Sequence, residues 1–203
     1  MDRAGHWQTV YRDTAADAVS WFQPVAATSL DLIERLAPGR DAAIVDVGGG
    51  TSRLIDGLLE TGYRDISVLD VAENALAISR ARLGERAEQV NWIVCDVTEC
   101  QPEREYDLWH DRAVFHFLTQ AGDRQAYASV LERALKPGGW CIIATFALDG
   151  PDRCSGLPVR RYDERLLMTE LGEGFELCDT RRETHLTPGG GTQEFVWFVL
   201  RRR

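Results

Sequence analysis

The sequence predicts an α/β protein with a doubly wound, mostly parallel sheet of seven strands, helices on both faces and a C-terminal antiparallel hairpin. Short apolar segments alternate with amphipathic ones along the chain, as in successive βαβ units. The run from Ala43 to Val47 leads directly into three glycines, which is typical of a strand-to-helix turn. The last two apolar segments are separated only by the loop from Thr187 to Gly191, which favours a hairpin.

The predicted elements follow from these patterns. Strands are expected at Ala43–Val47, Ile66–Val71, Val90–Val97, Tyr106–His110, Cys141–Phe146, Phe175–Arg182 and Glu194–Arg201. Helices are expected at Ser29–Leu36, Ser52–Thr61, Glu73–Leu83, Arg124–Leu135 and Glu164–Leu171. We expect one domain over residues 1–203, with a lid and helix in residues 1–40 and the core in residues 41–203. The segment before the first helix has little helical or strand periodicity.

The glycine turn indicates a nucleotide-cofactor site. Gly48, Gly49 and Gly50 leave the main chain accessible to a ligand and permit positive φ. Turn geometry alone also explains such glycines. Asp70 ends the second strand about 20 residues later, where nucleotide-binding folds place an acid against the ribose hydroxyls. Asp96 ends the third strand, where it could accept from the exocyclic amine of an adenine.

With these motifs and the turn from Leu135 to Gly139, the chain resembles class I S-adenosylmethionine-dependent methyltransferases. The resemblance is close over residues 42–148, is of the bacterial methyltransferase-domain type and extends distantly to the elongation-factor lysine methyltransferases. It implies S-adenosylmethionine as cofactor and no metal. The cofactor-binding residues implied in the core are Asp46, Gly48, Gly49, Gly50, Asp70, Val71, Asp96 and Val97.

Aromatic residues are concentrated before the first strand. His6-Trp7, Tyr11 and Trp21-Phe22 all precede residue 24. One interpretation is a plug at the end of the core, since large aromatics bury readily. The other is a lid in which Tyr11 and Trp21 cover the cofactor, because aromatic faces attract a sulfonium and a lid excludes water.

The end of the fourth strand is the densest polar cluster. His110 and His116 are candidate catalytic bases, and Asp111 and Arg112 are candidate substrate contacts. In the alternative interpretation, Asp111 and Arg112 form a structural ion pair and His116 is a hydrogen-bonded core histidine. The cluster lacks the Asn/Asp-Pro-Pro-Tyr motif of many enzymes that methylate amino groups of bases or glutamine, which disfavours those substrates.

The loop from Asp149 to Tyr162 is long for a compact domain, and such loops often carry function. We predict that Arg161 and Tyr162 contact the methyl acceptor. A solvated connection is the alternative.

Composition argues against several classes of protein. The net charge of −9 disfavours nucleic-acid binding, which concentrates Lys and Arg. The absence of a long apolar run disfavours a membrane protein, and the N-terminus lacks a signal-peptide pattern, so we expect a cytoplasmic protein. Five cysteines without a Cys-x-x-Cys pair predict neither a zinc site nor a disulfide framework.

The sequence therefore predicts methyl transfer to a small molecule or a protein lysine side chain, by a monomer or dimer. An NAD-binding oxidoreductase is the first alternative, disfavoured by Asp96 and by the lack of a Tyr-x-x-x-Lys pair. A catalytically silent cofactor-binding protein is the second alternative.

Overall fold

A computed structural model of the chain describes residues 2–203. Its helices are α1 (Arg3–Asp13), α2 (Ala27–Leu36), α3 (Leu54–Glu60), α4 (Glu73–Leu83), α5 (Ala121–Ala134) and α6 (Glu164–Leu171), with short 3-10 helices at Gly84–Gln89 and Phe115–Phe117. Its strands are β1 (Ala43–Val47), β2 (Asp65–Asp70), β3 (Val90–Val94), β4 (Tyr106–Arg112), β5 (Leu135–Phe146), β6 (Arg153–Cys154), β7 (Leu157–Pro158), β8 (Phe175–Leu186) and β9 (Thr192–Arg202).

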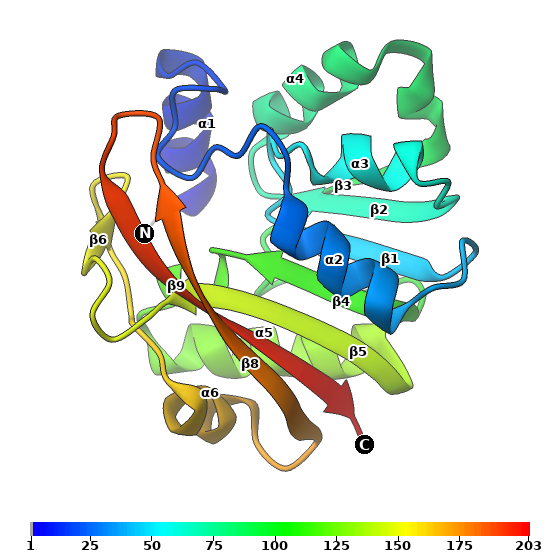
Figure 1. Ribbon diagram of the computed structural model, residues 1–203, viewed down its shortest axis with the longest axis vertical. Coiled ribbons are helices and arrows are strands. Elements are labelled where there is room, and N and C mark those ends of the chain that lie inside the picture. Colours follow the sequence, from blue (N-terminus) through cyan, green and yellow to red (C-terminus); the bar gives the residue numbers. More distant parts are fainter. Residues whose placement is uncertain (1) are drawn as a thin grey trace.

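Seven strands form one sheet in the order β3-β2-β1-β4-β5-β9-β8 (Figure 1). The pairs among β1 to β5 are parallel, and β9 runs antiparallel to both β5 and β8. The predicted fold class is thus confirmed, including the C-terminal hairpin. The strand order reverses between β1 and β4, and open α/β sheets bind ligands at the carboxyl ends of strands beside such a switch point.

Helices cover both faces of the sheet because side chains of each strand alternate in direction. In Figure 1, α2 and α3 cross in front of the sheet and α5 lies behind it. Val45 and Val47 of β1 belong to the hydrophobic cluster that contains the buried side chains of α5 and α6. Ile44, the residue before Val45, belongs to the opposite cluster, with the buried side chains of α2 and α3.

The turn expected over Leu135 to Gly139 lies inside β5, which begins at Leu135 and has an irregular register with β4 at this end. Two other segments contain elements that the sequence prediction lacked. Residues 3–13, expected to be irregular, form α1, whose N-cap Asp2 accepts from the Gly5 amide at 2.8 Å. The loop after β5 contains a small hairpin, with Arg153 and Cys154 paired to Pro158 and Leu157. In the helix and in the hairpin alike, hydrogen bonds between residues close in sequence stabilise an element that has no clear hydrophobic periodicity.

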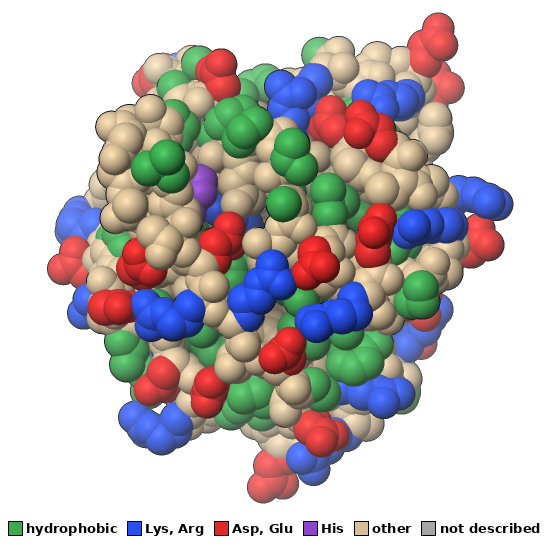
Figure 2. All heavy atoms as spheres, in the orientation of Figure 1, with side chains coloured by type: hydrophobic (Ala, Val, Ile, Leu, Met, Phe, Trp, Pro, Cys, Tyr) green, Lys and Arg blue, Asp and Glu red, His purple; other side chains and the backbone are tan. Residues whose placement is uncertain are grey.

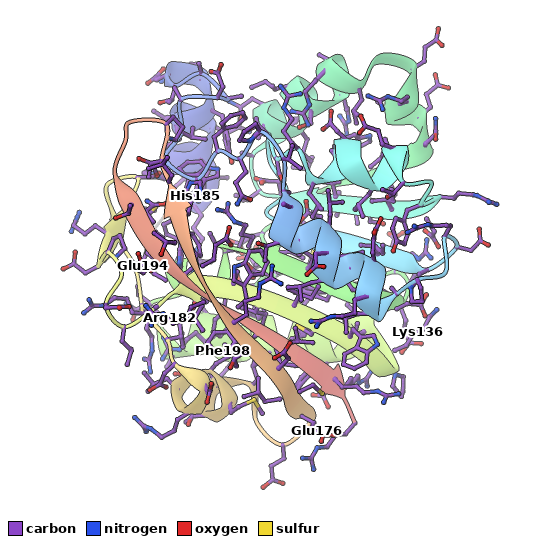
Figure 3. The ribbon with its side chains drawn as sticks, viewed as in Figure 1. Lys136, Glu176, Arg182, His185, Glu194 and Phe198 are labelled. Atoms are coloured by element: carbon purple, nitrogen blue, oxygen red, sulfur yellow. The ribbon has the colours of Figure 1, made fainter. Side chains whose placement is uncertain are left out.

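Surface charge is mixed. On the face shown in Figure 2, acidic and basic side chains are interspersed over the sheet and helices. Arg182 of β8, for example, lies 2.7 Å from Asp149 and 3.8 Å from Glu194 of β9, on the exposed side of the hairpin (Figure 3). Among residues 2–203, no helix combines the length and the apolar character that a bilayer crossing requires.

Candidate functional site

The main cavity lies at the carboxyl ends of β1, β2 and β4, beside the switch point. With its open mouth it has an empty volume of about 820 Å³. The predicted site residues that line it are Tyr11, Trp21, Gly48, Asp70, Val71, Asp96, Val97 and Arg112. Residues from the N-terminal segment, the glycine turn and three strand ends are therefore brought to one place.

The glycine turn opens this cavity toward the main chain. Gly48 has φ +65° and Gly50 has φ +44°, conformations that residues with a side chain rarely adopt. A Cβ on Gly48 would lie 2.0 Å from Val114 Cγ2. The amides of Gly48 and Gly49 donate to the Leu69 carbonyl at 2.7 and 3.3 Å, which fixes the turn against β2. The predicted need for glycine is thus confirmed at Gly48 and Gly50.

Asp70 lies at the end of β2, buried beside the turn. Its Oδ1 accepts from the Ala72 amide at 2.8 Å. A Cβ on Gly50 would lie 3.1 Å from Asp70 Oδ2, so the second oxygen faces the glycine turn. Burial raises the pKa of Asp70 to about 7, and the nearby charge of Asp46 contributes in the same direction. A buried carboxylate in this position is suited to accept from ligand hydroxyls.

Asp96 is engaged by other residues of the protein. Its Oδ1 accepts from the amide and hydroxyl of Thr98, at 2.9 and 2.7 Å. Its Oδ2 accepts from Arg3 Nη1 at 3.0 Å, and Arg3 also pairs with Asp123. Although burial opposes it, the hydrogen bonds from Thr98 and Arg3 lower the pKa of Asp96. Asp96 thus lines the cavity and at the same time holds α1 over it.

The N-terminal segment supplies one wall of the cavity, and this wall is made of aromatic side chains. Trp7 packs edge-on against Trp21 and Phe117, with ring centroids 5.8 and 5.0 Å apart. Tyr11 is buried, and its hydroxyl would lie 2.5 Å from a Cβ on Gly50. At the other end of this segment, the Ser20 carbonyl lies 2.8 Å from Nε2 of His185, which Figure 3 places at the end of β8.

His110 is held at both ring nitrogens. Its Nδ1 lies 2.7 Å from Asp46 Oδ1 and its Nε2 lies 3.0 Å from Ser29 Oγ. Asp46 and His110 are direct neighbours in the register of β1 and β4. Together with Gly48 and Gly49, both line a smaller cavity next to the main one. The sequence prediction placed His110 at the reacting methyl group, whereas the structure places it in a buried chain that connects the sheet to α2.

His116 lies in the core. Its Nδ1 accepts from the Phe146 amide at 3.3 Å, so the proton of the neutral ring is on Nε2. The ring packs on Phe117 and Phe146, each with centroids 4.6 Å away. Burial and the charge of Arg112 lower the pKa of His116 to about 3. This ring has no lone pair free to accept a proton, and it does not line the main cavity.

Three further predicted site residues lie outside the cavity lining. Asp111 is buried and accepts from the Val114 amide at 2.8 Å and the Tyr127 hydroxyl at 2.7 Å. Arg161 donates to the Gly150 carbonyl at 3.1 Å on the surface. Tyr162 is buried with its ring 5.2 Å from that of Phe115. Asp111 accordingly shapes the turn after β4, and the expected ion pair with Arg112 is absent from the described contacts.

The cavity also contains residues that the sequence analysis did not select. Arg3 and Trp7 line it from the face of α1 that also carries the predicted Tyr11. The i, i+4, i+8 spacing of these three, preceded by an Asp in the N-cap position, was the signal available in the sequence. Phe146, Cys154 and Phe195 line it from β5, β6 and β9. No local pattern marks these three, because only the sheet order brings them together.

Comparison with known proteins agrees with the fold. Residues 45–141, just under half of the chain, match a family described as "Methyltransferase domain". The malonyl-[acyl-carrier protein] O-methyltransferase 2 of Ilyobacter polytropus is 28% identical over 107 residues, 52% of this chain and 40% of that protein. The eEF1A lysine and N-terminal methyltransferase of Danio rerio is 24% identical over 148 residues, 71% of this chain and 21% of that protein.

The chain therefore spans less than half the length of these two curated relatives. Among solved structures, the N-methyltransferase NodS from Bradyrhizobium japonicum, crystallised with S-adenosyl-L-homocysteine, has a TM-score of 0.73 at 16% identity. That match covers 97% of this chain and 98% of NodS. Residues 45–141 are thus similar to a methyltransferase domain, and the chain as a whole has the fold of S-adenosylmethionine-dependent methyltransferase structures such as NodS.

Proposed function

We propose that this chain binds S-adenosylmethionine in the main cavity and catalyses transfer of its methyl group to an acceptor. The observation that carries the proposal is the pairing of the Gly48 turn with the buried carboxylate of Asp70 at one cavity. Gly48 lines the cavity with a backbone that has no room for a side chain beside Val114, and Asp70 supplies an acceptor for ribose hydroxyls. The matched methyltransferase domain and the fold shared with NodS support the same conclusion.

The residues present suit this cofactor from end to end. Asp70 and Val71 would hold the ribose, and Val97 and Asp96 would flank the adenine. Tyr11 and Trp21 would cover the sulfur end, where the ring faces favour a positive charge. S-Adenosylmethionine supplies a methyl group on a cationic sulfur, which is already activated for displacement. The protein's part is to orient the acceptor, exclude water and hold the cofactor in place.

We infer that methyl transfer proceeds without a histidine base. His116 accepts a backbone N–H at Nδ1 and carries its proton on Nε2. His110 is bonded to Asp46 and Ser29 and lines the smaller cavity. Neither ring offers a free lone pair to an acceptor in the main cavity. The acceptor then arrives with its nucleophilic lone pair available, and rate enhancement comes from proximity and alignment.

Calorimetry tests the cofactor assignment. S-Adenosylmethionine and S-adenosylhomocysteine should bind the unsubstituted protein and NAD should not. Binding of NAD with no binding of S-adenosylhomocysteine would support the oxidoreductase alternative instead. Turnover on metabolite and peptide panels, followed as release of S-adenosylhomocysteine, separates an enzyme from a silent cofactor-binding protein. It also decides between a small-molecule and a protein acceptor.

A further inference from the structure

The Arg112 guanidinium is a buried cation at the main cavity, and none of the described residues pairs with it as an anion. Its Nη1 donates to the Trp21 carbonyl at 2.9 Å. Its Nε and Nη2 are buried and have no hydrogen-bond partner among the described residues. The guanidinium carbon lies 4.8 Å from the centre of the Phe195 ring, which packs on the cation but accepts no N–H in its plane.

The two carboxylates whose charges act most on Arg112, Glu183 and Asp46, are hydrogen-bonded to other residues. Glu183 accepts from Trp197 Nε1 at 2.6 Å and from Gln23 Nε2 at 3.2 Å. Asp46 is bonded to His110 at 2.7 Å. Within residues 2–203, no carboxylate oxygen forms an ion pair with Arg112 at 4 Å or less. Burial lowers the pKa of Arg112 to about 10, so the group is still charged at neutral pH.

An unpaired buried donor costs folding free energy. Each unsatisfied buried N–H destabilises the folded protein, and the cost is larger when the group is charged. The two unpaired donors of Arg112, Nε and Nη2, lie on the same edge of the planar guanidinium. Two parallel N–H groups on one edge match the two oxygens of a carboxylate. One carboxylate bound at this edge would satisfy both donors together.

The position of Arg112 separates it from the groups proposed to hold the cofactor's nucleoside. Asp70 ends β2 and Asp96 follows β3, on one side of β1 in the sheet order. Arg112 ends β4 on the other side of β1. Phe195 of β9 packs on its guanidinium, and Phe146 of β5 lies against Phe195 with ring centroids 4.9 Å apart; both rings line the cavity. This end of the cavity pairs a single cationic group with aromatic walls.

We propose that Arg112 binds the carboxylate of an anionic methyl acceptor, an organic acid whose body packs against Phe146 and Phe195. This rests on the proposed function, because the other end of the same cavity must hold S-adenosylmethionine. Arg112 is then the residue that selects acids over neutral molecules of the same shape. Discrimination arises because a neutral amide leaves the buried cation without a counter-charge.

The experiment compares acids with their own primary amides. Small aromatic and aliphatic carboxylic acids, each paired with its amide and including benzoate and benzamide, are titrated into protein saturated with S-adenosylhomocysteine. Tryptophan fluorescence reports binding, since Trp7 and Trp21 line the cavity. At least one acid should bind the unsubstituted protein about tenfold or more tightly than its amide. Arg112→Gln should abolish that preference, and Arg112→Lys should restore only part of it, because lysine keeps the charge without the paired N–H edge.

Arg35→Gln is the matched control, since Arg35 is exposed and pairs with Asp179 at 3.2 Å on the surface. It should leave the preference unchanged. If no acid is preferred over its amide, or if the preference survives in Arg112→Gln, the proposal is wrong. Should Arg112→Gln fail to fold, the Arg112→Lys variant decides, and an undiminished preference there contradicts the role of the paired edge.

A second measurement excludes the amino-acid carboxylate of the cofactor as the partner of Arg112. S-Adenosylhomocysteine carries that carboxylate and 5′-methylthioadenosine lacks it. Arg112→Gln should weaken neither ligand by more than about twofold, a small fraction of the effect of losing a charged hydrogen bond. Selective loss of S-adenosylhomocysteine affinity overturns the acceptor proposal. Failure of the unsubstituted protein to bind S-adenosylhomocysteine at all contradicts the proposed function instead.

Discussion

Arg3 of α1 bonds to Asp96 after β3, with Nη1 3.0 Å from Oδ2, and thereby fastens the N-terminal helix across the cavity. Both side chains are largely but not fully buried, at 24% and 19% exposure. The contact links a predicted cofactor residue to a segment that precedes the first strand by some 30 residues. It gives the N-terminal helix a specific attachment to the core.

The first prediction concerns this attachment. Arg3→Gln should increase hydrogen exchange of amides in α1, because the helix loses its charged anchor and its own packing is confined to one face. S-Adenosylhomocysteine should restore part of the protection by filling the space beneath Trp7 and Tyr11. The control is Arg12→Gln, which removes an exposed pair with Asp13 at 2.8 Å. Equal exchange in both variants, with and without ligand, would favour a plain core plug.

Asp70→Ala should weaken S-adenosylhomocysteine binding by about 2 to 4 kcal/mol, the range expected for losing charge-assisted hydrogen bonds to two hydroxyls. Calorimetry measures the affinity and circular dichroism checks that the variant is folded. Asp65→Ala is the matched control, since Asp65 lies at the opposite end of β2 and pairs with Arg104. Unchanged affinity in a folded Asp70→Ala protein would remove Asp70 from the site.

Cofactor binding should also depend on pH through Asp70. The carboxylate is the form that accepts from ribose hydroxyls, and burial raises its pKa to about 7 in the free protein. Below that pH the group must lose a proton before it can bind in this way. Affinity for S-adenosylhomocysteine should therefore fall about tenfold between pH 8 and pH 6. Asp70→Asn should bind weakly at both values, so parallel curves for the two proteins would contradict this assignment.

Gly48→Ala should destabilise the fold more than Gly62→Ala. Both glycines have positive φ, at +65° and +91°, so both substitutions carry a backbone penalty of about 1 to 2 kcal/mol. A Cβ on Gly48 meets Val114 at 2.0 Å, whereas a Cβ on Gly62 meets nothing within 4 Å. The overlap should add about 1 to 3 kcal/mol to the loss of unfolding free energy. Urea denaturation measures both, and equal losses would mean that the turn relaxes freely around the new methyl group.

His116 should make the fold sensitive to acid. Its pKa in the folded protein, about 3, lies below the ordinary value of 6.5, because burial disfavours the charged ring. Between these values the unfolded chain binds a proton that the folded protein does not. This ring should therefore lower the free energy of unfolding by about 1 kcal/mol for each pH unit below 6.5. Asp70 and Asp111, whose pKa values are raised, act in the opposite direction as the pH falls.

The comparison of the unsubstituted protein with His116→Phe isolates the histidine. Phenylalanine fills a similar space between Phe117 and Phe146 and does not titrate. The difference in unfolding free energy between the two proteins should change in favour of the variant as the pH falls from 7 to 5. A difference that stays constant over this range would show that the ring titrates normally.

The sequence by itself determined most strands of the main sheet and the positions of Asp70 and Asp96 at or just after two strand ends. Strong apolar runs and glycine positions are local signals, so β1, the Gly48 turn and the carboxylate of Asp70 could be predicted within a residue or two. The hairpin of β8 and β9 could also be predicted, because a short glycine-rich loop between two strands favours their antiparallel pairing. These features depend on neighbours within about 20 residues.

The tertiary structure decided which side chains are available for chemistry. His110 and His116 look alike in sequence, yet register places one beside Asp46 and packing places the other against the Phe146 amide. Arg112 is adjacent to Asp111 in the chain, but alternation along β4 turns the two to opposite faces. Asp111 is bonded to Tyr127, whereas two donors of Arg112 have no partner among residues 2–203. Hydrogen-bond partners and burial depend on contacts between distant segments, and no local pattern in the sequence specifies them.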